Sequence, residues 1–283
     1  MHKVVNTLDY SVPASWKRFI KRLSPGLVAG FYRLLGRISS DRYEKITIQS
    51  GLLAGREFWC SLKRERPYFV GNYEHDVQDL MISLLKPGMV FYDIGGHNGF
   101  FSLLAANLVG QDGKVLTFEP NPSNVEIIKT NLGLNEDLAT VIQVHPLAIS
   151  KSSGTARFEG ASRSSMGRIQ SPSEPSSASV YEVQTISLDD FTASHPPPDV
   201  IKMDIEGGEV DALVGMDNLL KRKRPVVVVE IHNKEAHDAL LQFLQRQSYR
   251  ASQVGSKNPP TANPEWSEVD QYLAVPISKN NLL

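Results

Sequence analysis

The sequence has little cysteine, no long apolar run and no strong net charge, and each absence excludes a class of protein. The 283 residues include one cysteine, Cys60, so no disulfide can form within the chain. No apolar run reaches the roughly 20 residues of a membrane-spanning helix. A net charge of −1 argues against a nucleic-acid binder. Because the first residues also lack the features of a secretory signal, we expect a globular protein of the cytoplasm.

The positive charge of the chain is concentrated near its N-terminus. Residues 1–40 hold seven Lys or Arg and one acid, which gives +6 and leaves −7 for the remainder. Aromatic and aliphatic residues are interspersed among the basic residues of segment 12–38. This segment could lie on an anionic membrane surface as a peripheral contact. Alternatively, its helices pack over the core as a cap with their charges in water.

The pattern of the chain changes near Pro87. Before it, two short β patterns at 45–50 and 56–62 are separated by glycines and predict a hairpin. We therefore assign residues 1–62 to a basic helical and hairpin extension, and residues 63–283 to the main domain.

After Pro87, strand and helix patterns alternate. Strands that alternate with helices predict an α/β fold, with a doubly wound, mostly parallel sheet and ligands at the carboxyl ends of its strands. The seven expected strands are 89–94, 114–118, 140–144, 199–203, 225–231, 249–254 and 269–275. The expected helices are 100–108, 122–132, 209–220 and 234–247.

The region 150–180 interrupts this alternation. Its first 30 positions, 150–179, include 11 serines and show little periodicity. We expect a loop or loose hairpin inserted between the third and fourth strands. It is either a disordered insertion or a mobile lid that contacts the acceptor, and loop length alone does not decide between them.

A glycine-rich turn follows the first expected strand, with the spacing Asp93-x-Gly95-x-x-x-Gly99. Glycine permits positive φ and lets a ligand approach the backbone closely. The amides of the following helix can bind a carboxylate, and Asp93 can accept hydrogen bonds from a ligand ammonium group or from loop amides. The spacing differs from the Gly-x-Gly-x-x-Gly of dinucleotide-binding proteins.

A second acid, Glu119, lies 26 positions beyond Asp93, at the end of the next expected strand. An acid in this place can accept hydrogen bonds from both hydroxyls of a ribose. The two motifs predict a nucleoside ligand without a pyrophosphate, and S-adenosyl-L-methionine fits that description. The residues expected to bind it are Asp93, Gly95, Gly96, Gly99, Glu119 and Asn121.

Acids gather at the end of the fourth expected strand, where Asp204, Glu206 and Glu209 follow Lys202. Like charges this close raise at least one pKa unless a cation or donor compensates. Glu209 is expected only to stabilise the start of the next helix. Asp204 and Glu206 are candidates for catalysis at the mouth of the site, and helix capping is the alternative.

Glu230 and His232 lie two residues apart at the end of the fifth expected strand. His232 is the strongest candidate for a general base, because its unperturbed pKa lies near neutral pH. Otherwise it is a surface histidine before a helix. Asp204, Glu230 and His232 could together hold a divalent cation, but the spacing does not demand one and we expect no metal.

Taken together, these residues resemble the FkbM-type family of S-adenosylmethionine-dependent methyltransferases, over roughly residues 45–245. Gly96 stands where the family commonly has alanine. The motifs that carry the resemblance are Phe91-Tyr-Asp-Ile-Gly-Gly-His-Asn-Gly99, Phe118-Glu-Pro-Asn-Pro122, Leu188-Asp-Asp190, Ile201-Lys-Met-Asp-Ile-Glu-Gly-Gly-Glu209 and Val229-Glu-Ile-His232.

The resemblance implies a class I methyltransferase fold and transfer of a methyl group to a hydroxyl oxygen. The acceptor would be a sugar, a glycolipid or a natural product. It also implies that Asp93, Gly95, Gly99 and Glu119 bind the cofactor. Two alternatives remain open: a non-catalytic Rossmann-like binding module, and a nicotinamide-dependent oxidoreductase, against which the missing third glycine counts.

Overall fold

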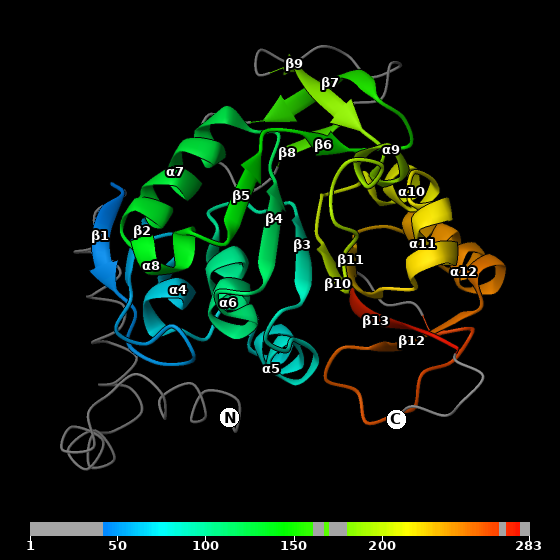
Figure 1. The fold of residues 1–283 in the computed structure, drawn as a ribbon, viewed down its shortest axis with the longest axis horizontal. Helices are drawn as coiled ribbons and strands as arrows, with labels where there is room; N and C mark the ends of the chain where they lie inside the picture. The colour runs from blue at the N-terminus through cyan, green and yellow to red at the C-terminus, as the bar shows by residue number, and fades with distance from the viewer. Residues whose placement is uncertain (1–41, 161–166, 170–179, 266–269, 278–283) are drawn as a thin grey trace, which may run out of the picture. The chain divides into compact units, whose positions relative to one another are not determined.

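The computed structural model describes residues 42–160, 167–169, 180–265 and 270–277 of the chain (Figure 1). The chain divides into two compact units, residues 1–75 and residues 76–283. The basic segment 12–38 lies outside the described residues. The domain boundary placed at residue 62 stays a prediction, because a compact unit of the structure need not fold independently.

In the first unit, the predicted hairpin is confirmed. β1 (Glu44–Thr47) and β2 (Glu57–Cys60) pair antiparallel, with Ile46 opposite Phe58. Both of these side chains are buried, as expected when alternate residues of a strand face one side. A short helix, α4 (Arg66–Val70), follows and begins with a proline, whose fixed φ suits the first turn.

The second unit contains a seven-stranded sheet in the order β12-β13-β11-β10-β3-β4-β5. The five strands from β11 to β5 are parallel, and β13 pairs antiparallel with both β11 and β12. The predicted mostly parallel sheet is therefore confirmed. Its strands are β3 (Val90–Ile94), β4 (Lys114–Phe118), β5 (Ile142–His145), β10 (Val200–Met203), β11 (Val226–Ile231), β12 (Tyr249–Gln253) and β13 (Asp270–Pro276).

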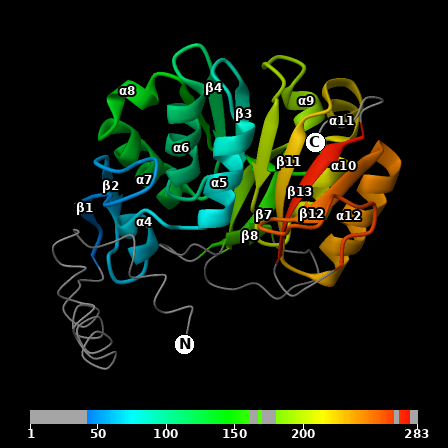
Figure 2. The ribbon, with the colours of Figure 1, turned by 90° about the horizontal axis from the view of Figure 1, so that it is seen from below.

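Helices cover both faces of this sheet, because its central strands are apolar on both sides. Tyr92, Ile201 and Val229 face one core together with residues of the later helices, and Figure 2 shows α12 beside β12 and β13. Helix α6 packs against β3, β4 and β5. The helices are α5 (His75–Leu84), α6 (Phe100–Val109), α7 (Pro122–Gly133), α8 (Glu136–Ala139), α9 (Leu188–Phe191), α10 (Glu209–Val214), α11 (Asp217–Lys223) and α12 (Lys234–Gln247).

The single helix predicted at 209–220 is wrong, because the structure has two helices here, α10 and α11, that meet at Gly215. A Cβ atom at Gly215 would lie 2.1 Å from the backbone oxygen of Ser150. The close approach of another segment therefore requires glycine here, and glycine weakens a helix.

The described part of the insertion forms a second, four-stranded sheet in the order β6-β9-β7-β8. Its strands are β6 (Ala148–Ile149), β7 (Gly154–Gly160), β8 (Gly167–Ile169) and β9 (Val180–Ile186). β7 and β9 pair antiparallel over six residue pairs, so this part is a regular antiparallel sheet and not a loose hairpin. Residues 161–166 and 170–179 lie outside the described residues, and a role as a lid stays a prediction.

None of the helices in the described ranges combines the length and the apolar character needed to cross a membrane.

Candidate active site

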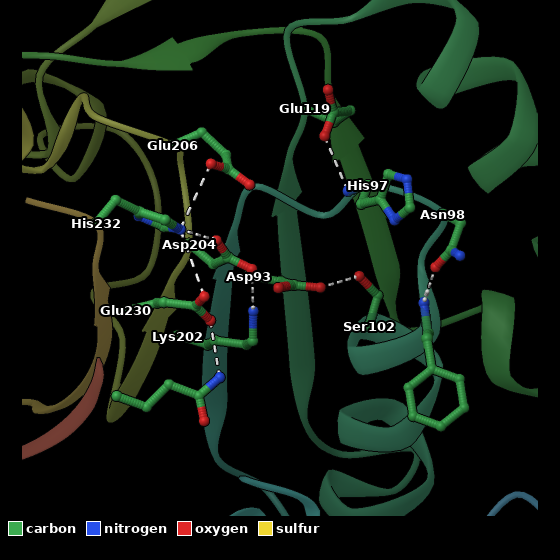
Figure 3. Close-up of polar contacts among 12 residues, drawn as sticks. Asp93, His97, Asn98, Ser102, Glu119, Lys202, Asp204, Glu206, Glu230 and His232 are labelled. Atoms are coloured by element: carbon green, nitrogen blue, oxygen red, sulfur yellow. Dashed lines mark hydrogen bonds and ion pairs between the residues drawn. The ribbon is translucent and has the colours of Figure 1, made fainter. Parts of the chain in front are cut away.

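The candidate site lies at the carboxyl ends of β3, β4, β10 and β11, where the polar residues singled out in the sequence come together (Figure 3). Parallel pairing sets this arrangement, because neighbouring parallel strands end at the same edge of the sheet. The amide of Gly95 donates to the carbonyl of Phe118 at 2.9 Å, and the amide of Asp204 donates to the carbonyl of Ile94 at 3.0 Å. These hydrogen bonds join the ends of β3, β4 and β10.

The turn after β3 requires glycine for two reasons. Gly95 has φ +84°, which favours glycine, and a Cβ atom there would lie 1.8 Å from the backbone oxygen of Asp204. At Gly96 a Cβ atom would lie 2.3 Å from Cγ2 of Thr117. Gly99, with φ +83°, is the N-cap of α6. These glycines let the turn lie directly on the two neighbouring strands.

Asp93 lies below this turn and is buried. Its Oδ2 accepts from the hydroxyl of Ser102 at 2.5 Å, and Ser102 is also 2.8 Å from the hydroxyl of Thr117. Its Oδ1 has no hydrogen-bond partner among the described residues. Burial raises the pKa of Asp93, while the charge of Lys202 opposes this shift. A buried carboxylate with one unpaired oxygen suits a ligand that brings a donor.

Glu119 is also buried, and both of its carboxylate oxygens accept backbone amides. Oε2 accepts from His97 at 2.8 Å and Oε1 from Asn121 at 2.9 Å. Burial raises the pKa of Glu119 to about 7, although these hydrogen bonds work in the opposite direction. Glu119 therefore fixes the turn after β3 and keeps the remaining lone pairs of its carboxylate for a ligand.

Asn121 caps helix α7, since its side-chain oxygen accepts from the amide of Ser123 at 2.9 Å. Its Nδ2 is buried and has no hydrogen-bond partner within the described ranges, so a donor remains next to Glu119. His97 has φ +49°, and burial lowers its pKa to about 4, so that the ring is neutral at pH 7. The backbone amide of His97 donates to Glu119.

His232 lies at the centre of a cluster of carboxylates on the other side of the turn. Its Nε2 is 3.4 Å from Oε1 of Glu230 and 3.6 Å from Oδ1 of Asp204. The same nitrogen is 3.6 Å from Oε2 of Glu206. Its Nδ1 is 2.7 Å from Oε1 of Glu209. We name these five residues, Asp204, Glu206, Glu209, Glu230 and His232, the acid–histidine cluster.

The charges of the cluster perturb one another. Burial by itself lowers the pKa of His232, but the hydrogen bonds to Glu209 and Glu230 and the nearby charges raise it to about 10. Burial raises the pKa of Glu206. The chain alone therefore holds His232 as an imidazolium at neutral pH. Glu206 has φ +53°, an uncommon backbone conformation for a residue with a side chain and one found at functional sites.

Two members of the site were missed in the sequence. Glu209 was expected only to cap α10, but its side chain is fully buried and contacts His232. Gln271, on β13, donates from Nε2 to Oε2 of Glu230 at 2.7 Å. The antiparallel pairing of β13 with β11 places Gln271 opposite Glu230. No local sequence pattern signals this pairing, because 41 residues separate the two side chains.

Comparison with known proteins places the chain in a family. Residues 93–251, more than half of the chain, match the methyltransferase FkbM domain, so the chain belongs to this family of methyltransferases. The family's cofactor is S-adenosyl-L-methionine, in agreement with the prediction from the two acidic motifs. The buried, unpaired oxygen of Asp93 and the glycine turn fit such a ligand.

Among individual relatives, the hexuronic acid methyltransferase AglP of Haloferax volcanii is 32% identical over 163 residues, which cover 56% of this chain and 62% of AglP. The chain thus spans less than two thirds of that relative. The methyltransferase FkbM of Methylobacillus flagellatus shares 15% identity at a TM-score of 0.46, covering 74% of this chain and 54% of that one. A putative rRNA methylase of Clostridium thermocellum shares 12% identity at a TM-score of 0.47, covering 73% and 97%.

The turn after β3 generates a first prediction. We expect Gly95→Ala to lower the free energy of unfolding by about 2–5 kcal/mol, because it adds a left-handed backbone penalty to a clash with Asp204. Gly88→Ala is the matched control, since Gly88 has φ +85° but a Cβ atom there meets nothing within 4 Å. It should cost only about 1–2 kcal/mol. Denaturant titration measures both, and equal losses would contradict the role of close packing.

Proposed function

We propose that this chain transfers a methyl group from S-adenosyl-L-methionine to a hydroxyl oxygen, and that the acceptor is a sugar, a glycolipid or a natural product. The observation that carries the proposal is the pair of buried carboxylates at adjacent strand ends, Asp93 and Glu119, on either side of a glycine turn within the family match. AglP supports a sugar acceptor, because its name assigns it a hexuronic acid.

Each cofactor-binding residue has a defined task in this proposal. Glu119 accepts hydrogen bonds from the ribose hydroxyls, with the lone pairs that the two backbone amides leave available. Oδ1 of Asp93 accepts from the ammonium group of the methionine part. Gly95, Gly96 and Gly99 let the ligand approach the backbone. Asn121 offers its Nδ2 beside Glu119.

The acid–histidine cluster acts on the acceptor. The bound cofactor supplies a methyl group already activated by its sulfonium charge, so the chain has to align the acceptor oxygen and exclude water. A sugar hydroxyl is a poor nucleophile, and a base must take its proton as the bond to carbon forms. We assign this role to Asp204, or to His232 once its ring has lost the proton that the surrounding carboxylates hold on it. Glu206 is assigned to orienting the acceptor hydroxyl at the partly exposed side of the cluster.

Neither alternative function accounts for the site as well. A non-catalytic module would not require the acid–histidine cluster, whose members come from the ends of two strands and the start of α10. A nicotinamide enzyme would need a turn that accommodates a pyrophosphate, and the spacing after Asp93 lacks that third glycine. We retain the cytoplasm as the location on the basis of the single cysteine.

Cofactor binding should depend on pH through Glu119. Its pKa of about 7 means that the carboxyl becomes protonated as the pH falls below 7, and the protonated group accepts fewer hydrogen bonds from ribose. We expect the Kd for S-adenosylhomocysteine to rise by about tenfold from pH 8 to pH 6. Calorimetry measures this. Glu119→Gln should bind weakly at both values, and a parent protein with the same Kd at pH 6 and pH 8 would refute the assignment.

The two candidate bases are tested by Asp204→Asn and His232→Ala. Loss of a general base lowers turnover by about 10²–10⁴-fold. We expect at least one variant to show such a loss while its Kd for S-adenosylhomocysteine stays within about threefold of the parent's, because neither residue is assigned to the cofactor. The acceptor for this assay is first identified by incubating the enzyme with labelled donor and cell extract and isolating the labelled product. Normal turnover in both variants would exclude the cluster from catalysis.

A further inference from the structure

The acid–histidine cluster supports an inference beyond the assignment of a general base. We propose that Asp204, Glu230 and His232 form a binding site for one divalent transition-metal cation at the carboxyl ends of β10 and β11. From the sequence these three residues could hold a cation, but their spacing did not demand one and we expected no metal. The three-dimensional arrangement of the ligand atoms, their orientation and the charge around them supply the reasons.

The distances match those between ligands of one ion. One ligand atom from each of the three residues lies within 4.8 Å of the other two. Nε2 of His232 lies 3.4 Å from Oε1 of Glu230 and 3.6 Å from Oδ1 of Asp204. Two atoms that each bind an ion at about 2.1 Å, at angles of about 90–110°, are roughly 3.0–3.4 Å apart. Small side-chain rotations close the remaining difference.

Neighbouring residues outside this set of three orient the ligand atoms. Gln271 holds Oε2 of Glu230 at 2.7 Å, which turns Oε1 toward His232. Glu209 binds Nδ1 of His232 at 2.7 Å, which leaves Nε2 directed at the two carboxylates. Metal-bound histidines characteristically donate their second ring N–H to a carboxylate in this way. The same contact selects the tautomer that a metal requires.

The excess of negative charge in the cluster is a further reason to expect a cation here. The side chain of Glu209 is 0% exposed and extends into the cluster to contact His232, yet its Oε2 has no hydrogen-bond partner among the described residues. Four carboxylates meet here, and among the described residues they form ion pairs with Lys202, 3.4 Å from Asp204, and with His232 when it is protonated. Carboxylates that are buried or partly buried in excess of their counter-charges are costly, and a divalent ion would reduce that excess.

The cluster is also open enough to admit an ion and an acceptor. The side chains of His232, Glu230 and Asp204 are 13%, 18% and 22% exposed, so three protein ligands leave coordination positions for solvent or substrate. One imidazole and two carboxylates suit Mn²⁺ or Zn²⁺ better than Ca²⁺, which prefers oxygen ligands alone. If the proposed methyl transfer holds, this ion would bind the acceptor hydroxyl and promote loss of its proton.

Direct binding of Mn²⁺ tests the proposal without donor or acceptor. Chelator-treated, full-length protein is titrated with MnCl₂, and free Mn²⁺ is followed by electron paramagnetic resonance. We expect one bound Mn²⁺ per chain, displaced by Zn²⁺, and a Kd raised at least tenfold in Glu230→Gln and in Asp204→Asn. The matched control is Glu126→Gln, which changes an exposed glutamate on α7 and should bind as the parent does.

Two results would overturn the site: no stoichiometric binding of Mn²⁺ or Zn²⁺ by the parent, or parent-like binding by both variants. Circular dichroism checks that each variant folds, and if one does not, the other decides. Binding of S-adenosylhomocysteine is measured in parallel on the same samples. If the parent binds S-adenosylhomocysteine but no metal, only the cation site is refuted. If it binds metal but no S-adenosylhomocysteine, only the proposed cofactor site is refuted.

Discussion

The close approach of two backbone segments, the turn after β3 and the end of β10, is the constraint on which the site depends. Gly95 lies so near the carbonyl of Asp204 that no side chain fits between them, and the amide of Asp204 bonds the carbonyl of Ile94. This contact sets the separation between the buried carboxylates of β3 and β4 and the acid–histidine cluster. A methyl transfer needs donor and acceptor held in line, so a fixed separation between their two sites is what the chemistry requires.

The two halves of the site hold their charges by different means. Glu119 is held by two backbone amides, whose positions are set by the turn after β3 and the start of α7. His232 is held by three side chains, one after β10, one at the start of α10 and one on β11, and its protonation depends on all of them. The first arrangement suits recognition of one invariant cofactor. The second suits chemistry, in which a proton or cation must be able to move.

Most of the fold could be predicted from the sequence because its parallel strands are buried on both faces. Their continuous apolar runs, such as 226–231, identify them without reference to the rest of the chain. The strand order could not be read in this way. β13 inserts antiparallel beside β11, and only that register brings Gln271 to Glu230. Likewise, the break between α10 and α11 depends on a carbonyl from residue 150, which helical periodicity does not include.

The serine-rich insertion was expected to be disordered or to form a lid that contacts the acceptor, and its described part has a defined position. A Cβ atom on Gly160, at the end of β7, would lie 3.4 Å from Nδ2 of Asn121 and 3.0 Å from the hydroxyl of Tyr181 on β9. The hairpin therefore packs against the turn that carries Glu119 (Figure 1). Burial, and after it the negative charge of Glu119, raise the pKa of Tyr181 to about 12. If Glu119 binds the ribose as proposed, a neutral tyrosine beside it places this part of the insertion at the nucleoside end of the site.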